Sequence, residues 1–170
     1  MSDNLVKEPP SLFMLVGLPC TGKSTIIRKE LAQRPQTVVL STDDFIEVYA
    51  ETHGVSYNEA FASVYGAATA NLMEVLRLAI QHDRNVVWDQ TNLTAKQRRK
   101  KMNHFPSHYR KYAIVVTERD PDVLTARMKE HRPNKVIPYS VLQKMSNDFE
   151  MPTKEEDFDE IFLADGTKIE

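Results

Sequence analysis

The sequence predicts an α/β fold in which a five-stranded parallel sheet carries helices on both faces. Short apolar runs, mostly of β-branched residues, alternate along the chain with segments of helical spacing. The runs are apolar on both faces, which is typical of parallel strands buried between two layers of helices. The chain has 170 residues, 41% of them apolar and 27% charged, and we expect a single domain over residues 1–170.

The predicted elements follow one another in regular order. The predicted strands are residues 12–16, 37–40, 86–88, 112–117 and 161–163. The predicted helices are residues 24–33, 57–82, 94–104, 121–130 and 140–149. Residues 1–10 predict a flexible N-terminus, and the acidic stretch 151–160 predicts a surface connection before the last strand.

Composition and charge exclude several classes of protein. A formal net charge of −2 and a pI near 6.2 argue against bulk, charge-driven nucleic-acid binding, although they leave room for a local basic groove. The single cysteine, Cys20, rules out an internal disulfide framework and fits a reducing compartment. No signal peptide is recognisable, and no apolar run approaches the roughly 20 residues needed to cross a bilayer. We therefore expect a cytoplasmic protein without a membrane partner, in the host cytoplasm if a phage encodes it.

A glycine-rich segment follows the first predicted strand. Residues 17–24 read Gly-Leu-Pro-Cys-Thr-Gly-Lys-Ser, which fits the spacing of the Walker A phosphate-binding loop at every defined position. Glycines in such a loop permit backbone angles that let successive N–H groups point at an anion. Lys23 supplies a charge for the β- and γ-phosphates, and the Ser24 hydroxyl is placed to bind Mg²⁺. We expect ATP and Mg²⁺ as cofactors, and the residues expected to hold them are Gly17, Leu18, Pro19, Cys20, Thr21, Gly22, Lys23, Ser24 and Thr25.

Two aspartates follow the second predicted strand. Asp43 and Asp44 lie just beyond its carboxyl end, at the edge of an open α/β sheet where ligands bind. A carboxylate there can accept the proton of an attacking hydroxyl during phosphoryl transfer. We take Asp43 as the general base, with Asp44 as the alternative base. If Asp43 is the base, we expect Asp44 to contact the substrate. The competing interpretation is that the two aspartates cap a helix beginning at Phe45.

The third predicted strand ends in a similar polar segment. Asp89 is a candidate to hold Mg²⁺, as a Walker B acid does, or to orient the acceptor. Thr91 and Asn92 offer short polar side chains for a hydroxyl or phosphate of the substrate. The alternative is a turn in which Asn92 or Thr94 caps the next helix.

An arginine-bearing segment follows the fourth predicted strand and its helix. Residues 127–138 predict a lid that closes over the nucleotide and neutralises charge on the transferring phosphoryl group. Arg132, next to the helix-breaking Pro133, is the first candidate for this charge, and Arg127 could share the work. Lys129 and Lys135 are expected to be solvated.

Together these segments resemble the kinase domain of the bacteriophage polynucleotide kinases, in the zeta-toxin and adenylate-kinase-like group of P-loop kinases. The matching residues are 17–25, 42–45, 89–93 with Arg98 and Arg99, and 127–138 with Val141 and Leu142, and the resemblance covers most of residues 11–149. It implies a P-loop NTPase fold with an arginine-bearing lid, and transfer of the γ-phosphate of ATP to a 5′-hydroxyl of DNA or RNA with Mg²⁺. It also implies that Lys23 and Ser24 bind phosphate and metal, Asp43 is the general base and Arg132 is the lid arginine.

One position departs from the family. The family has an arginine three positions after the catalytic aspartate, where it grips a phosphate of the acceptor strand, whereas this chain has Ile46. Either another basic residue does this work or the acceptor differs from an ordinary strand end.

A basic run, residues 96–101, lies on the helix after Asn92. Its charges, including Arg98 and Arg99, could follow a nucleic-acid backbone or could form a solvated helix face. The first functional hypothesis is therefore a kinase of nucleic-acid 5′-hydroxyls. The alternatives are a kinase of a 5-hydroxymethyluracil base in phage DNA, a small-molecule kinase, and a non-catalytic ATP-dependent RNA-binding module.

Overall fold

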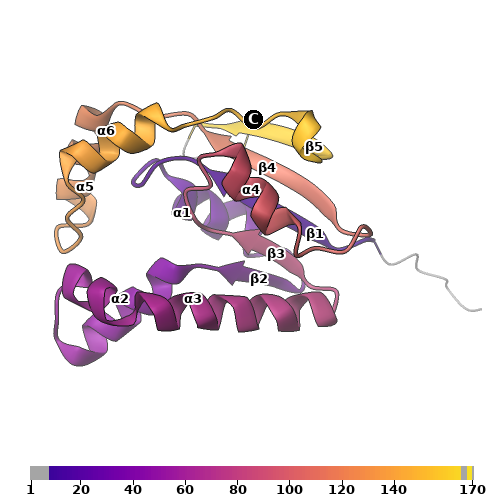
Figure 1. The fold of residues 1–170 in the computed structure, drawn as a ribbon, viewed down its shortest axis with the longest axis horizontal. Helices are drawn as coiled ribbons and strands as arrows, with labels where there is room; N and C mark the ends of the chain where they lie inside the picture. Colours follow the sequence, from indigo (N-terminus) through magenta and orange to yellow (C-terminus); the bar gives the residue numbers. More distant parts are fainter. Residues whose placement is uncertain (1–7, 166–167, 170) are drawn as a thin grey trace, which may run out of the picture.

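The computed structural model describes residues 8–165 and 168–169, so most of the predicted flexible N-terminus lies outside the described residues. The predicted fold class is confirmed: one sheet of five parallel strands has the order β2-β3-β1-β4-β5 (Figure 1). The strands are β1 (Ser11–Val16), β2 (Thr37–Leu40), β3 (Asn85–Trp88), β4 (Arg110–Val116) and β5 (Glu160–Ala164). The α-helices are α1 (Lys23–Ile26), α2 (Thr42–His53), α3 (Tyr57–Gln81), α4 (Ala95–Met102), α5 (Pro121–His131) and α6 (Tyr139–Asn147).

The central strand β1 is buried on both faces because its alternate residues pack into different cores. Leu12 and Met14 of β1 pack with α3 and with the segment that follows α4, whereas Phe13 and Leu15 pack with α1 and the turn after it. This alternation follows from the two-residue side-chain period of a strand. Burial on both faces explains why β1 is apolar from Leu12 to Val16 and could be predicted from the sequence.

The prediction placed no helix over residues 42–53 beyond a possible start at Phe45, and this is corrected by α2. The helix begins at Thr42 because the side chain of Ser41 accepts a hydrogen bond from the backbone N–H of Asp44 (3.1 Å). It ends at Gly54, which has the left-handed conformation (φ 64°) that favours glycine. Asp43 and Asp44 therefore lie in the first turn of α2, and the cap is Ser41.

Two further boundaries differ from the prediction. The helix after the phosphate-loop segment is α-helical only to Ile26 and continues as a π-helical turn, Ile27–Leu31. The predicted surface connection contains a short 3₁₀ helix, Lys154–Glu156, in which Glu156 is buried. Among the residues that the structure describes, no helix combines the length and apolarity needed to cross a membrane.

Candidate active site

The segment between β1 and α1 has the backbone that its two glycines allow. A side chain at Gly17 would place its Cβ 2.9 Å from the carbonyl oxygen of Val116, a contact that real Cβ atoms do not make. Gly22 precedes α1 in the left-handed region (φ 102°). The loop is held from outside by a hydrogen bond from the Gly17 N–H to the Thr91 carbonyl (3.0 Å). The two glycines are therefore needed by the loop geometry itself.

Lys23 is buried at the start of α1. Its ammonium group donates to the carbonyl oxygens of Gly17, at 2.9 Å, and of Leu18. Burial lowers the pKa of Lys23 to about 8, while the carboxylates of Asp89 and Asp43 oppose this shift. The lysine thus lies close to both predicted carboxylates and has a charge that an incoming anion would stabilise.

A pocket of about 420 Å³ unites three segments that are far apart in the sequence. It is lined by the glycine-rich segment and α1, by Asp43 of α2, and by the stretch that follows α5. Its lining residues are Pro19, Cys20, Gly22, Lys23, Ser24, Thr25, Arg28, Asp43, His131, Arg132, Lys135 and Ile137. We call this the phosphate pocket, because its walls combine a Walker A loop with several cations.

Asp43 is held by two side chains, neither of which was predicted. The hydroxyl of Tyr57, at the start of α3, donates to Oδ1 (2.6 Å), and the ammonium group of Lys135 pairs with Oδ2. The prediction that Lys135 is solvated is wrong, because its side chain is only 11% exposed. It also stacks over the Tyr57 ring, with the ammonium nitrogen 4.3 Å from the ring centroid.

The charges around Asp43 decide its protonation. Burial alone would raise its pKa, but the charge and hydrogen bond of Lys135, the Tyr57 hydrogen bond and the charge of Arg132 together hold the pKa of Asp43 below its ordinary value. Asp43 is therefore ionised at neutral pH, as a general base must be. Burial and the Asp43 hydrogen bond raise the pKa of Tyr57, so the phenol remains a donor.

Arg132 lies beside α2, the helix that carries Asp43. It lies at the end of α5 and donates from Nη1 to Oε1 of Glu47 (3.0 Å), one turn after Asp43 on α2. Arg127 points elsewhere: it does not line the phosphate pocket, and its guanidinium pairs with Glu118 at 3.7 Å. Of the two predicted lid arginines, Arg132 therefore lines the phosphate pocket and Arg127 does not.

The predicted metal ligands are Ser24 and Asp89. Ser24 is exposed on the pocket wall, and Asp89 follows β3 close enough to Lys23 for their charges to interact. Burial, with Asp44 and Asp43 nearby, raises the pKa of Asp89, an effect that a bound cation would reverse. No cluster of three or more acidic, histidine or cysteine ligands occurs within residues 8–165 and 168–169. This donor set fits Mg²⁺ bound chiefly through nucleotide phosphates, with one or two protein ligands.

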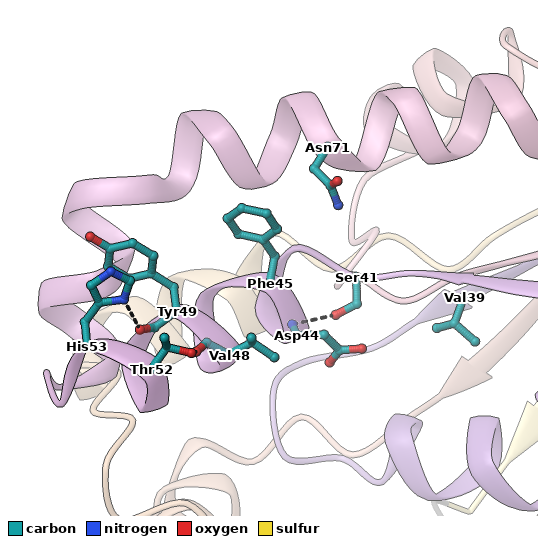
Figure 2. A pocket seen from close by; sticks show the side chains of 9 residues that line it. All are labelled: Val39, Ser41, Asp44, Phe45, Val48, Tyr49, Thr52, His53 and Asn71. Carbon is teal, nitrogen blue, oxygen red and sulfur yellow. Dashed lines mark hydrogen bonds between the residues drawn. The ribbon is translucent and has the colours of Figure 1, made fainter.

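Asp44 faces a different pocket, shown in Figure 2. This second pocket, of about 470 Å³, shares no residue with the phosphate pocket. Its lining combines aromatic, aliphatic and polar side chains from β2, α2 and α3: Val39, Ser41, Asp44, Phe45, Val48, Tyr49, Thr52, His53 and Asn71. Tyr49 and His53 stack on each other with ring centroids 3.9 Å apart. We call it the α2 pocket.

Thr91 and Asn92 have structural roles in the loop after β3. The Asn92 side chain is 1% exposed and donates to the carbonyl of Leu15 (2.7 Å), which ties this loop to β1. Its backbone is left-handed (φ 49°), which asparagine tolerates. Asn92 was predicted to contact substrate, but its amide is already bonded inside the protein. Thr91 supports the phosphate loop through its carbonyl oxygen.

The basic run on α4 is split between the core and the surface. Arg98 is fully buried and forms a two-point pair with Glu156, at 2.8 and 2.7 Å. The prediction that Arg98 contacts substrate is therefore wrong, because its donors are committed to Glu156 and to backbone carbonyls. Lys101 also turns inward, onto Gln90 and Asn92, and burial lowers its pKa to about 8. Arg99 is exposed and remains available.

Ile46 lies on the buried side of α2. It is 0% exposed and packs with Ala50 and Tyr57 between α2 and α3. An arginine at this position would be buried against α3. The packing around Ile46 therefore suits an apolar side chain in place of the family arginine. Any acceptor phosphate must be held by other residues.

Comparison with known proteins agrees with this architecture. The family described as AAA domain matches residues 12–152. A candidate kinase from Chloroflexus aurantiacus superposes with a TM-score of 0.65 at 20% identity, over 95% of this chain and 87% of that one. A chain of the Pnkp1/Rnl/Hen1 RNA repair complex gives a TM-score of 0.64 at 20% identity, over 87% of this chain and 46% of that one. A protein of the PezAT toxin–antitoxin system of Streptococcus pneumoniae gives 0.60 at 15% identity, over 92% and 67%. At these identities the likeness shows the fold alone.

Proposed function

Because the chain belongs to the AAA domain family and has the fold of P-loop kinases, we propose that it transfers the γ-phosphate of ATP to a hydroxyl of nucleic acid, with a 5′-hydroxyl of DNA or RNA as the first acceptor. One observation carries the proposal. Asp43 lies on the wall of the same pocket as Lys23 and Ser24, so a base faces the place where the terminal phosphate would be held.

The proposed reaction gives each of these groups a role. The acceptor oxygen attacks the γ-phosphorus, its proton passes to the Asp43 carboxylate, and the bond to the β,γ-bridging oxygen breaks as ADP leaves. Lys23 and the loop N–H groups hold the phosphates, and Arg132 faces the same pocket with a charge that can stabilise the transferring phosphoryl group. Mg²⁺, held by Ser24 and through Asp89, would neutralise phosphate charge.

The α2 pocket, next to Asp43, favours an acceptor that carries a nucleobase. Asp44, the neighbour of Asp43, lines the α2 pocket. The rings of Phe45 and Tyr49 in the same pocket give a surface on which a base can stack. The carboxylate of Asp44 and the amide of Asn71 can bond to the edge of a base. These features support a nucleic-acid or nucleoside acceptor over a plain sugar.

A second candidate acceptor is a hydroxymethyl group on a base within DNA. Helix α2 is poorly suited to bind a backbone phosphate next to the reacting hydroxyl. Ile46 is buried and uncharged, and Asp44, Glu47 and Glu51 carry negative charges that repel a phosphate. A hydroxyl carried by a base lies farther from the backbone, so its transfer does not require a cation on α2 to bind the neighbouring phosphate.

Parallel transfer assays test the proposal. Purified protein, Mg²⁺ and γ-labelled ATP should be offered 5′-hydroxyl oligonucleotides, duplex containing 5-hydroxymethyluracil, and nucleosides. We expect label at the 5′ end, and label on the internal base alone would establish the second candidate instead. Label on nucleosides alone would indicate a small-molecule kinase. ATP binding without transfer to any acceptor would favour a binding module.

Asp43→Asn separates catalysis from nucleotide binding. The substitution keeps the shape of the side chain and removes its ability to take a proton. We expect transfer to fall at least about a hundredfold, with ATP affinity nearly unchanged. Lys23→Ala serves as the contrasting variant, because it should abolish both. Near wild-type transfer by Asp43→Asn would overturn the assignment of the base.

A further inference from the structure

Both carboxylate oxygens of Asp43 already have partners. Tyr57 donates to Oδ1 from α3, which is packed against α2, and Lys135 approaches Oδ2 from the lid segment after α5. The acceptor hydroxyl must reach the same carboxylate to lose its proton. Two partners leave further lone pairs of Asp43 for this hydroxyl, but Lys135 lines the phosphate pocket, where the terminal phosphate would be held.

We propose, building on the kinase function above, that Tyr57 is a fixed positioning residue for Asp43 and that Lys135 is an exchangeable one, which leaves Asp43 for the terminal phosphate when nucleotide binds. Tyr57 acts through Asp43 and does not touch the reacting atoms. Lys135 both shields the base before nucleotide arrives and delivers a charge to the transferring group afterwards.

The packing of Tyr57 explains why it stays in place. Its ring belongs to the core formed by Ile46, Ala50, Ala60 and Ala68, between α2 and α3. The preceding Ser56 forms a capping box with Glu59, which fixes the first turn of α3. A phenol held in this way can orient one carboxylate oxygen without moving, which leaves the other lone pairs of Asp43 for the acceptor.

The position of Lys135 explains why it can move. It lines the phosphate pocket together with Lys23 and Ser24, and its positive charge already acts on Lys23. It also lines a neighbouring pocket of about 650 Å³, which contains Tyr57 and Arg132. A rotation of its long side chain is enough to pass from Asp43 to an anion in the phosphate pocket. An ammonium group is a mobile point charge suited to such an exchange.

Other charged groups also act on Asp43. Arg132 from the lid lowers its pKa, and Asp43 itself interacts with Lys23 on α1 and with Asp89 after β3. These groups remain in the variants below, so their influence is common to every measurement. The effect of Lys135 is then the difference between two otherwise identical proteins.

The test is the titration of the Asp43 carboxyl, followed by ¹³C NMR in the protein alone and with Mg²⁺ and the ATP analogue AMP-PNP. In the protein alone, Lys135→Met and Tyr57→Phe should each move the Asp43 midpoint to higher pH, because each removes a group that favours the carboxylate. With AMP-PNP bound, the Lys135→Met difference should shrink, because the hydrogen bond to Asp43 is lost and only the charge of Lys135 still acts, whereas Tyr57→Phe should keep its difference. Lys129→Met and Tyr65→Phe, both at exposed positions, are the matched controls.

Each possible result decides one part of the proposal. A Lys135→Met difference that is as large with AMP-PNP as without it would overturn the exchange, because Lys135 would then remain bonded to Asp43. A Tyr57→Phe midpoint equal to that of the wild type would overturn the positioning role. Failure of AMP-PNP to bind would overturn the kinase function and the exchange together. A thermal melt of each variant separates these results from unfolding.

Discussion

The hydroxyl of Tyr57 lies 2.6 Å from Oδ1 of Asp43, although the two residues belong to different helices and are separated by 14 positions. The contact exists because α2 and α3 pack against each other through Ile46, Ala50 and Ala60. The same packing that excludes an arginine at position 46 thus brings a phenol to the proposed base.

Removal of the Tyr57 hydroxyl should slow transfer without weakening nucleotide binding. Tyr57→Phe keeps the ring in the α2–α3 core and loses only the hydrogen bond to Asp43. We expect kcat to fall about tenfold, the size of one lost hydrogen bond to a charged group, with the KM for ATP unchanged.

The pH dependence gives this variant a second readout. The hydrogen bond lowers the pKa of Asp43, so its loss raises that pKa. The base is active when ionised, and the acidic limb of the kcat/KM profile should therefore move to higher pH. A uniform loss of rate at every pH would instead indicate a merely structural role. Tyr65→Phe should behave as the wild type.

Nucleotide affinity should depend on pH through Lys23. In the free protein burial lowers the pKa of Lys23 to about 8, and phosphates bound beside it should raise that pKa again. Below pH 8 the lysine is charged in both states, so the affinity for ATP should be constant. Above pH 8 binding must take up a proton, and affinity should fall by up to about tenfold per pH unit.

Calorimetry in buffers of different ionisation enthalpy measures this proton uptake directly. Lys101 is the internal control, because burial also lowers its pKa to about 8 but it binds Gln90 and Asn92 outside the phosphate pocket. Lys101→Met should keep the proton uptake seen in the wild type. Proton uptake that disappears in this variant would show that Lys23 is not its source.

Local patterns predicted the sheet and the phosphate loop. Strand β1 is apolar from Leu12 to Val16 because both its faces are buried, and the loop needs glycine at positions 17 and 22 because of its backbone. Each of these signals lies within a few neighbouring residues. A sequence without any structural context is sufficient to recognise them.

The partners of the proposed base could not be predicted in this way. Lys135 lies 92 positions from Asp43, and the sequence predicted it to be solvated, whereas Arg132, next to Pro133, was predicted to carry the lid charge. The contact of Lys135 with Asp43 depends on how the lid packs against α2, which no local pattern reports. The burial of Arg98 did leave one signal, since Met102 lies one turn later on the same, inward face of α4. Its acceptor Glu156, however, is 58 positions away.

Arg98 should matter for stability and not for substrate binding. Arg98→Ala leaves Glu156 buried without its partner, and the carbonyls of Asn92, Leu93 and Glu150 each lose a donor. We expect a loss of about 3–5 kcal/mol in the free energy of unfolding, measured by urea denaturation. Arg99→Ala, at the exposed neighbour, should change it by less than about 0.5 kcal/mol. Equal stabilities of the two variants would contradict the buried pair.

The α2 pocket should affect the binding of the acceptor and not the binding of the nucleotide. Tyr49→Ala removes an aromatic surface from this pocket, which shares no lining residue with the phosphate pocket (Figure 2). If a base of the acceptor stacks there, the KM for a 5′-hydroxyl oligonucleotide should rise about tenfold, because base–aromatic stacking contributes roughly 1–3 kcal/mol per base. Hydrolysis of ATP with water as the acceptor should keep its rate, which confines the effect to acceptor binding. Tyr65→Ala, on the exposed face of α3, is the matched control. An unchanged KM in Tyr49→Ala would place the acceptor base elsewhere, while an equal loss of transfer and hydrolysis would mean that the substitution disturbs α2 and Asp43 with it.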